Sequence, residues 1–452
     1  MHLANRCFRW FAAMSIFLLA SCGSGGGGSA DSGGGVTPPP PAAGSCASAY
    51  PPNFSFVTGT ANPAQAAAGK PTKGVNFTDT AFGTCAVRVT NHAVEAPQDF
   101  ARNDYSRRQA FNADSSLLLV NANNGFWHVY NAINYAYLKQ LNGPAGDAEP
   151  QWHPTDPNIL YYLPTNGVGM QVLELNVSAN TNRVVGDLES RLRARWPNAG
   201  AAWTKSEGSP SADARYWCFM VDSVSGSSFA TVGVVTWDRV NDQILGFYDT
   251  NGDRPDHVSM SPSGNYCVIS GDGQRGTVAL ARDLNPASLR QLLPKSEHSD
   301  IALAANGHDV YVSVDYQSAQ GDVFMIDLTN GDRTVLFPTY INGTATALHI
   351  SGKGFHKPGW IVMSTYAANK NGQSMTSGFE WLHRKVMAVE LKSGPRVYQL
   401  AHHHSADLNY WDEPQASVNR DFTKILFNSN WESSNFLDVD AYMVELPAGL
   451  IQ

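Results

Sequence analysis

The amino-acid sequence predicts an all-β fold, a seven-bladed β-propeller, and three observations lead to this prediction. A short apolar pattern that ends near a turn recurs seven times along the chain. Each copy follows a turn and a further apolar run, which is typical of antiparallel hairpins. Equivalent turns lie 42 residues apart from Asp114 to Asp156 and 43 apart from Ser263 to Asn306. That period matches the four-stranded unit of a propeller.

Each repeat is expected to contribute four antiparallel strands. Turn-led runs such as "NADSSLLLV" and "SPSGNYCVI" predict the second strands. The third strands are the seven copies of the pattern: "FWHVYNA" from Phe126, "MQVLELN" from Met170, "VGVVTWD" from Val232, "VALARDL" from Val278, "VFMIDLT" from Val323, "VMAVELK" from Val386 and "AYMVELP" from Ala441. Fourth strands follow six of these copies: "YLKQL", "RVVGD", "QILGFY", "RQLLP", "RTVLF" and "RVYQL".

The seventh copy has no fourth strand, whereas "TCAVRVT" (Thr84 to Thr90) is a strand without a repeat. We expect this N-terminal strand to form the outer strand of the last blade, because ring closure removes two exposed sheet edges together. A six- or eight-bladed ring is the alternative, since Asp187 to Pro197 has a helix-like pattern and the third and sixth repeats carry insertions.

The first residues predict export. Arg6 and Arg9 precede an apolar run of signal-peptide length, and Leu19, Ala20, Ser21 and Cys22 look like the lipobox of bacterial lipoproteins. We therefore expect a signal peptide over 1–21, a lipid on Cys22 and a Gly/Ser/Pro-rich tether over 22–45, with the propeller over 46–452. This organisation predicts a membrane-anchored lipoprotein of the outer membrane, and an ordinary signal peptide cut nearby is the alternative.

The composition limits the kinds of partner that the protein is expected to bind. The net charge of −8 and the lack of a long basic run argue against nucleic acid. Aromatic residues make up 11% of the chain, including 11 Trp, which suits carbohydrate binding and a β-rich core equally well. We expect a monomer that contacts a membrane only through its lipid.

Cys46 and Cys85 could pair, whereas Cys218 and Cys267 lie in apolar runs and are interpreted as buried thiols.

In a propeller, the loops that enter the first strand of each blade share one mouth of the central channel. Charged, amide or imidazole groups precede the second strand of every predicted blade: Arg107, Arg108, Gln109, Glu149, Gln151, Glu207, Asp256, His257, His298, Asp300, His349, Glu413 and Gln415. The run His402 to His404 is expected in a loop at the same mouth, outside the core and in part solvated. Histidine is both a common metal ligand and an acid/base at neutral pH.

Two passages resemble the oligogalacturonate lyases, which are seven-bladed propellers that cleave pectic oligomers by β-elimination with a manganese-type ion. "TAFGTCAVRVTNHAVEAPQDFARNDYSRRQAFNADSSLLLVNANNGFWHVYNA" resembles the opening of that family, and "YWDEPQASVNRDFTKILFNSN" resembles its last blade. These motifs are partly shared with TolB-like and WD40-like propellers. The chain departs from the family at the last-blade ligands, where it has Tyr410, Glu413 and Gln415, and at the blade-four arginine, where it has Met260.

The resemblance and the residue set together predict a polysaccharide or oligosaccharide lyase that acts on uronates. β-Elimination needs the uronate carboxylate neutralised, the C5 proton removed and the leaving oxygen protonated. We assign Arg108, His257 and Tyr410 to these three steps, and Arg254, Glu149, Trp411 and Gln415 to substrate binding. One Mn²⁺ or Ca²⁺ ion is expected on His298, His349 and Glu413.

Two other functions fit the same sequence. A non-catalytic propeller would bind glycan or protein partners through the same mouth. A glycoside hydrolase would need two carboxylates at a defined separation, for which Glu149 and Glu413 are available.

Overall fold

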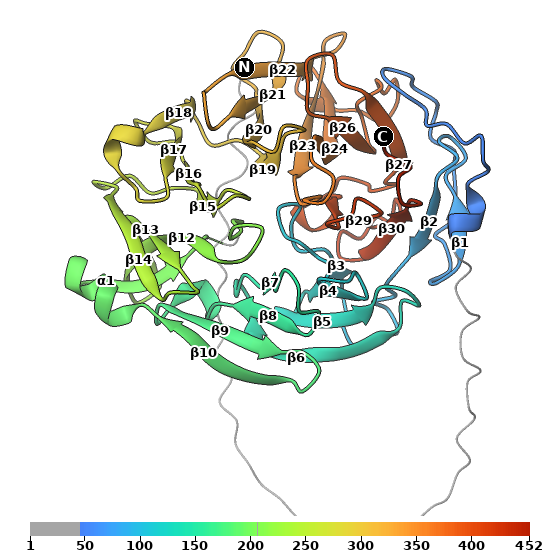
Figure 1. The fold of residues 1–452 in the computed structure, drawn as a ribbon. Coiled ribbons are helices and arrows are strands. Elements are labelled where there is room, and N and C mark those ends of the chain that lie inside the picture. Colours follow the sequence, from blue (N-terminus) through green and yellow to red (C-terminus); the bar gives the residue numbers. More distant parts are fainter. Residues whose placement is uncertain (1–45, 206) are drawn as a thin grey trace, which may run out of the picture. The chain divides into compact units, whose positions relative to one another are not determined.

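The computed structural model describes residues 46–205 and 207–452. The predicted signal peptide over 1–21, the tether over 22–45 and the lipidation site Cys22 lie outside these residues. Within the described residues, four-stranded antiparallel sheets follow one another around a ring, which is the predicted propeller (Figure 1). No helix of this part is both long and apolar enough to cross a membrane.

Five blades are separate sheets whose strands run in chain order, with the first strand toward the centre of the ring (Figure 1). The second blade consists of β7 (Gln151–Trp152), β8 (Ile159–Tyr162), β9 (Gln171–Asn176) and β10 (Thr181–Asp187). The third consists of β11 (Ala199–Trp203), β12 (Tyr216–Ser225), β13 (Ser228–Asp238) and β14 (Gln243–Asp249). The fourth blade consists of β15 (His257–Met260), β16 (Tyr266–Ser270), β17 (Thr277–Ala281) and β18 (Arg290–Leu293). The fifth consists of β19 (Ser299–Leu303), β20 (Asp309–Asp315), β21 (Asp322–Asp327) and β22 (Arg333–Pro338).

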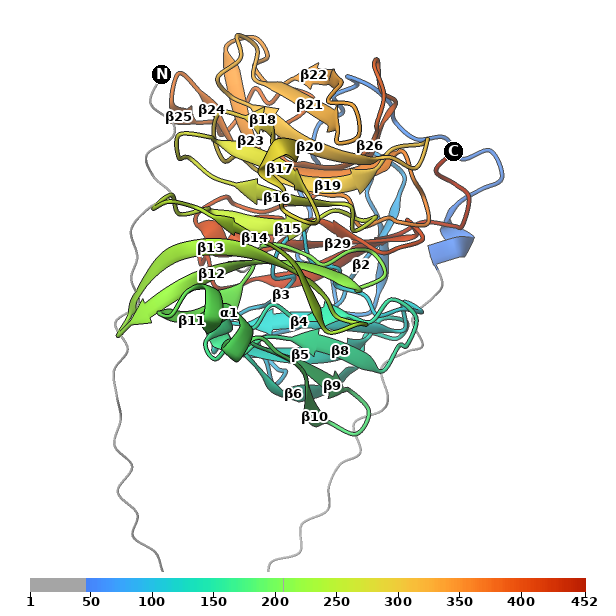
Figure 2. The ribbon, with the colours of Figure 1, turned by 60° about the vertical axis from the view of Figure 1, so that its left-hand side comes forward.

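The sixth blade consists of β23 (Thr344–Ser351), β24 (Trp360–Lys370), β26 (Lys385–Glu390) and β27 (Val397–His402), with β25 (Gln373–Ser374) pairing on the extended end of β24. The predicted insertion of this blade is that extension. The helix-like pattern forms α1 (Glu189–Arg195) between the second and third blades (Figure 2). Short 3-10 turns occur at Cys46–Ala49, Thr165–Gly167, Pro286–Ser288 and Tyr410–Asp412.

The last and first blades close the ring. The last blade consists of β28 (Ser417–Val418), β29 (Lys424–Ser429) and β30 (Asp440–Glu445), and the first of β3 (Ala101–Arg102), β4 (Leu117–Ala122), β5 (Phe126–Asn131) and β6 (Tyr137–Ala145). β2 (Cys85–Arg88) pairs antiparallel with β30 and so supplies the outer strand, as predicted, while β1 (Asn76–Thr78) pairs outside it. A single parallel bridge, Ala101 to Asp440, joins the two blades.

Neighbouring blades pack face to face through apolar side chains, because both faces of each blade are covered by its neighbours. Trp217 and Trp237 are among the largest fully buried side chains and belong to a cluster that runs from the second to the fourth blade.

Two disulfides add covalent links within the described residues. Cys46 pairs with Cys85, which ties the N-terminal segment to β2. The interpretation of Cys218 and Cys267 as buried thiols is wrong, because they form a second disulfide between β12 and β16 of adjacent blades. Their apolar surroundings do not exclude pairing, since two cysteines on facing strands of stacked blades come within bonding reach.

Candidate functional site

Polar side chains from six blades meet near the centre of the ring, in a chain of contacts that we call the central cluster. Its members are Arg107, Glu207, Asp256, His257, His298, His349 and Glu413. Arg107 precedes β4, Glu207 follows β11, His257 begins β15, His298 precedes β19, His349 belongs to β23 and Glu413 precedes β28. All seven are among the residues expected at the channel mouth.

Arg107 reaches the cluster because the inner edge of the first blade is interrupted. β3 pairs with one end of β4, and Phe111 bridges to Leu118 at the other end. Residues 103–108 leave the sheet between these two points. Arg108 was expected to be catalytic, but it is Arg107 that extends from this excursion into the cluster.

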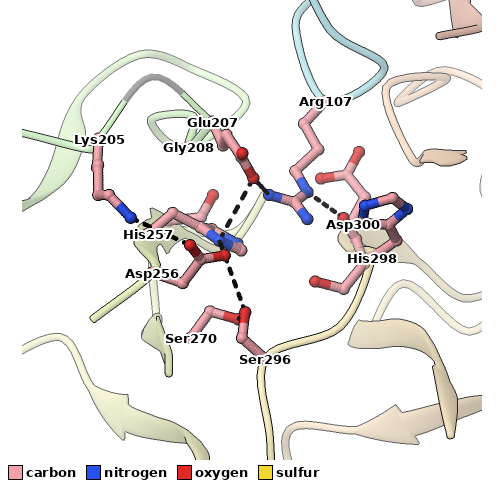
Figure 3. Close-up of polar contacts among 12 residues, drawn as sticks. Arg107, Lys205, Glu207, Gly208, Asp256, His257, Ser270, Ser296, His298 and Asp300 are labelled. Atoms are coloured by element: carbon pink, nitrogen blue, oxygen red, sulfur yellow. Dashed lines mark hydrogen bonds and ion pairs between the residues drawn. The ribbon is translucent and has the colours of Figure 1, made fainter. Parts of the chain in front are cut away.

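The Arg107 guanidinium connects three blades. Its Nε donates to the carbonyl of Ser299 in the fifth blade, and its Nη1 forms an ion pair with Glu207 in the third. Only 3% of Arg107 is exposed. Figure 3 shows the remaining nitrogen, Nη2, pointing toward the region between His257 and His298 without a drawn contact. Because arginine stays protonated in proteins, this arrangement offers a fixed positive charge with an available donor.

His257 is held between two carboxylates. Its Nδ1 lies 3.4 Å from Asp256 Oδ2 and 3.6 Å from Glu207 Oε2. Asp256 is itself bound by Lys205 at 3.1 Å and by the Ser296 hydroxyl at 3.0 Å (Figure 3). Desolvation and the nearby Arg107 lower the pKa of His257, although both carboxylates oppose that shift. The imidazole is therefore neutral at neutral pH and can accept a proton.

His298, His349 and Tyr366 form a group of stacked rings beside Arg107. The ring centroids of His298 and His349 are 4.7 Å apart, and those of His349 and Tyr366 are 4.5 Å apart. His298 Nδ1 lies 2.6 Å from the Leu348 carbonyl, so Nδ1 carries the proton and Nε2 is the acceptor in the neutral ring. Desolvation, followed by the charge of Arg107, lowers the pKa of His298.

His349 and Glu413 form a buried pair. His349 Nε2 lies 3.3 Å from Glu413 Oε2, yet neither ring nitrogen of His349 makes a hydrogen bond within the described chain. Desolvation, then His298, Arg107 and Arg102, lowers the pKa of His349 well below its ordinary value. Desolvation also raises the pKa of Glu413 well above its ordinary value. Burial thus disfavours the charged form of both partners.

The second blade supports the cluster from behind. Both carboxylate oxygens of Glu149 accept the backbone N–H of Thr204, at 3.1 and 2.9 Å, and one also accepts the Thr204 hydroxyl. Gln151 Nε2 donates to the carbonyl of Gly208 at 3.2 Å. Glu149 was expected to bind substrate, but it is 1% exposed and anchors the loop that carries Glu207. It is therefore not available as one of two hydrolase carboxylates.

Two predicted arginines are engaged outside the cluster. Arg108 is buried, with Nε donating to Asp104 at 2.7 Å and its guanidinium over the ring of Trp127. Arg254 pairs with Asp222 at 3.3 Å and lines a separate small pocket with Tyr248 and Arg275. The structure thus gives the catalytic assignment of Arg108 and the substrate-binding assignment of Arg254 no geometric support.

Tyr410 and Trp411 stand on the short 3-10 turn that precedes Glu413. Tyr410 is 44% exposed, whereas the Trp411 ring stacks on Phe100 with centroids 5.1 Å apart. Desolvation raises the pKa of Tyr410, opposed by the charge of Arg102, and the carboxylates of Asp104, Glu207 and Glu413 raise it further. The phenol is therefore protonated at neutral pH, and it lies close enough to Glu207 and to Glu413 for both to affect its pKa.

The histidine run is buried, contrary to the expectation of a partly solvated loop. His403 is fully buried between the Thr365 carbonyl and the backbone N–H of Ser405. His402 packs on Phe82, and His404 stacks on Trp431. These imidazoles fill the joint between the last two blades and the N-terminal segment, so they are structural residues.

Two groups of three His, Cys, Asp or Glu residues in the described chain bring ligand atoms within 4.8 Å of one another: His92 with Asp438 and Asp440, and Glu207 with Asp256 and His257. Cations already compensate both groups, through Lys70 and Arg88 in the first and Arg107 and Lys205 in the second. The predicted triad of His298, His349 and Glu413 is neither of these groups, although His349 stacks on His298 and lies 3.3 Å from Glu413.

His349, Glu413 and Gln415 are linked through Glu413 Oε2 and carry nitrogen and oxygen atoms of the kinds that bind a divalent cation. Gln415 Nε2 donates to Glu413 Oε2 at 3.1 Å, and Gln415 Oε1 is buried without a hydrogen-bond partner in the described chain. The His349 nitrogens are unsatisfied in the same way. Buried polar atoms are normally paired, and an imidazole with carboxylate and amide oxygens suits a manganese-type ion.

Sequence reasoning did not assign a role to Arg107, Glu207, Asp256, Tyr366 or Arg102. The first three belong to the set expected at the mouth, and their position before a second strand was the available signal. Tyr366 lies in the middle of β24 and looks like any strand tyrosine. Arg102 lies in a two-residue strand whose facing side chains cannot be read from alternation.

Comparisons with known proteins place the fold. No family model matches the sequence, and no curated protein sequence matches it. Among solved structures, an oligogalacturonate lyase in complex with manganese is 13% identical, with a TM-score of 0.56 over 82% of this chain and 96% of that chain.

A second oligogalacturonate lyase, from Vibrio parahaemolyticus, is 12% identical, with a TM-score of 0.57 over the same shares of the two chains. At this identity the likeness concerns the fold. The chain is similar in architecture to oligogalacturonate lyase propellers, and its central cluster has to be interpreted from its own side chains.

Proposed function

We propose that this protein is a β-eliminating lyase that cleaves uronate-containing oligosaccharides or polysaccharides at the central cluster. The observation that carries the proposal is the position of Arg107 Nη2, a fixed positive donor that points between two buried, neutral imidazoles (Figure 3). Elimination from a uronate needs this combination, because the carboxylate must be neutralised before the adjacent C5 proton becomes acidic enough to remove.

The side chains divide the reaction as follows. Arg107 Nη2 binds the carboxylate of the reacting sugar and stabilises the negative charge that develops there. His257, oriented by the carboxylates at its Nδ1, takes the C5 proton on Nε2. The electrons of the C5–H bond form the C4–C5 double bond, and the C4–O bond breaks. The Tyr410 hydroxyl gives a proton to the leaving oxygen.

Desolvation favours this chemistry. The Arg107 guanidinium is buried, so its attraction for the developing negative charge is stronger than it would be in water. The half-buried Glu207 carboxylate, 3.6 Å from His257 Nδ1, stabilises the positive charge that His257 gains. A divalent cation on His349, Glu413 and Gln415, when bound, would supply additional positive charge for the substrate carboxylate. The manganese of the structurally similar lyase supports testing for such an ion.

The test is a screen of the purified protein against polygalacturonate, an alginate and a glucuronan, with the absorbance of unsaturated ends as the readout. We expect unsaturated product from at least one polymer. His257→Gln should lower the rate at least about 100-fold, which is the usual contribution of a general base. Thermal melting of the variant should match that of the wild type.

His356→Gln is the matched control, because His356 also pairs with an aspartate through Nδ1 (Asp421, 2.6 Å) but is exposed. It should retain the wild-type rate. Unchanged activity in His257→Gln would contradict the assigned base. Reducing ends without unsaturation would indicate hydrolysis, and binding without any cleavage would favour a non-catalytic glycan-binding propeller.

A further inference from the structure

Arg102 is a buried arginine without a carboxylate partner among the described residues. Only 1% of it is exposed, although it lies on the inner strand β3 beside the turn that carries Tyr410. Its Nη1 donates to the carbonyls of Asn103 and Asp104, at 3.2 and 3.1 Å. Its Nε is buried without an acceptor among the described residues, and Nη2 donates to none of them.

Other arginines near this site are neutralised. Arg107 pairs with Glu207, Arg108 with Asp104 and, at the joint of the first and last blades, Arg88 with Asp440. A buried charge is costly unless it is paired, and a buried polar atom normally has a partner. Arg102 therefore differs from its neighbours: it is a buried cation whose guanidinium still has hydrogen-bond donors without an acceptor in the described chain.

Aromatic rings hold the guanidinium in place. Its central carbon lies 4.9 Å from the ring centroid of Trp411, 5.1 Å from that of Phe100 and 5.5 Å from that of Tyr410. Such faces stabilise a cation without consuming its hydrogen-bond donors. Of the three rings, Tyr410 is the exposed one. The rings around Arg102 that reach the surface are thus Tyr410 and, in part, Trp411.

Arg102 lies close to the reacting centre without touching it. Its charge and that of Arg107 both act on His349, and it is the main cation that acts on Glu413. The central cluster therefore lies between two guanidinium groups, of which Arg107 belongs to the proposed catalytic step and Arg102 does not.

We propose that Arg102 binds the carboxylate of a second uronate residue, next to the sugar whose carboxylate Arg107 holds. This inference rests on the proposed function, because it names the neighbouring unit of the same substrate. It assigns the protein to chains in which acidic sugars follow one another. Tyr410 and Trp411 would pack on the ring of that second sugar, as aromatic side chains do on the apolar faces of carbohydrates.

Calorimetric binding tests this proposal with trigalacturonate and trimannuronate as acidic probes and their fully methyl-esterified forms as neutral ones. The wild type should bind at least one acidic trimer about 10- to 100-fold more tightly than its methyl ester, which is the range expected for charge-assisted hydrogen bonds. Arg102→Met should lose most of this preference. Arg102→Lys should keep part of it, because the charge remains while the two-pronged geometry is lost.

Arg396→Met is the control, because Arg396 also lies over an aromatic ring, that of Trp360, but on the outside of the sixth blade. It should bind both forms as the wild type does. An Arg102→Met variant that weakens acid and ester equally, or neither, would overturn the proposal, as would a wild type that binds neither acidic trimer. Arg102-dependent binding without unsaturated product would refute the lyase while leaving this inference intact.

Discussion

Replacing Asp440 by asparagine should open the joint between the first and last blades. Asp440 is fully buried at the start of β30, where the single parallel bridge to β3 joins the two blades. Its carboxylate binds Arg88 at 2.6 Å, Lys70 at 3.0 Å and the backbone N–H of His92 at 2.9 Å. Arg88 belongs to the closing strand β2, so this carboxylate ties the closing strand to the ring.

The size of the effect follows from burial. Removing one partner of a buried ion pair costs about 3–5 kcal/mol, because the other charge remains buried. The unfolding entropy of roughly 400 residues is about 0.8 kcal/mol/K, so the melting temperature should fall by about 4–6 °C. Asp438→Asn is the control. Asp438 also pairs with Lys70 but is 33% exposed, so its loss should cost less than about 1 kcal/mol.

Scanning calorimetry at several pH values checks the reasoning. Desolvation opposes ionisation, but His92, Lys70 and Arg88 together hold the pKa of Asp440 well below its ordinary value. The stability it contributes is therefore complete above the unfolded pKa of about 3.9 and is lost as the pH falls further. The difference between wild type and Asp440→Asn should be constant from pH 7 to about pH 5 and shrink below about pH 4. Equal melting temperatures at pH 7 would refute the proposed role of this carboxylate.

Three further predictions concern other parts of the chain. Because its surroundings lower the pKa of His257, uronate cleavage should keep its rate down to about pH 6.5 and decline only below it; a rate that already falls above pH 7 would contradict a His257 base. The double variant Cys218→Ala, Cys267→Ala should unfold with about 2–4 kcal/mol less stability in calorimetry, since it frees a link spanning 49 residues. If Cys22 carries lipid, the wild type expressed with its export signal should partition into detergent and Cys22→Ser should not; equal partitioning would exclude that anchor.

The fold was predictable because it is repetitive. Each blade repeats one apolar pattern, and the pattern of the third strands, from Phe126 to Ala441, gives both the number and the order of the blades. Ring closure could also be predicted, since one repeat lacked a strand and Thr84 to Thr90 was a strand without a repeat. The pairing of β2 with β30 confirms this closure.

The site was predictable only in outline, because the inner strands are short. β3, β7 and β28 have two residues each, too few for alternation to show which side chains face the centre. Arg107 and Arg108 could not be distinguished for this reason, since both lie on the excursion between β3 and β4. The role of Glu149 could not be predicted for a similar reason. A glutamate at this position can bind substrate or anchor a loop, and the sequence does not distinguish the two roles.

The histidine run shows a different limit. Its burial depends on residues more than 300 positions away: Asp79 accepts the backbone N–H of His402, and Gln65 Nε2 lies 3.0 Å from His404 Nδ1. The segment that carries Gln65 and Asp79 has little apolar periodicity. Nothing local to the three histidines indicates that a chain from the other end of the sequence covers them.

Closure of the ring and assembly of the site depend on each other. Arg107 of the first blade binds Ser299 of the fifth and Glu207 of the third, while Glu149 of the second holds the loop of Glu207. His349 of the sixth blade meets Glu413 of the last. These contacts join different blades, so the distances between their atoms depend on where the blades lie in the ring. The closing strand therefore fixes the geometry of the candidate site from the outer edge of the last blade, far from the residues that would carry the chemistry.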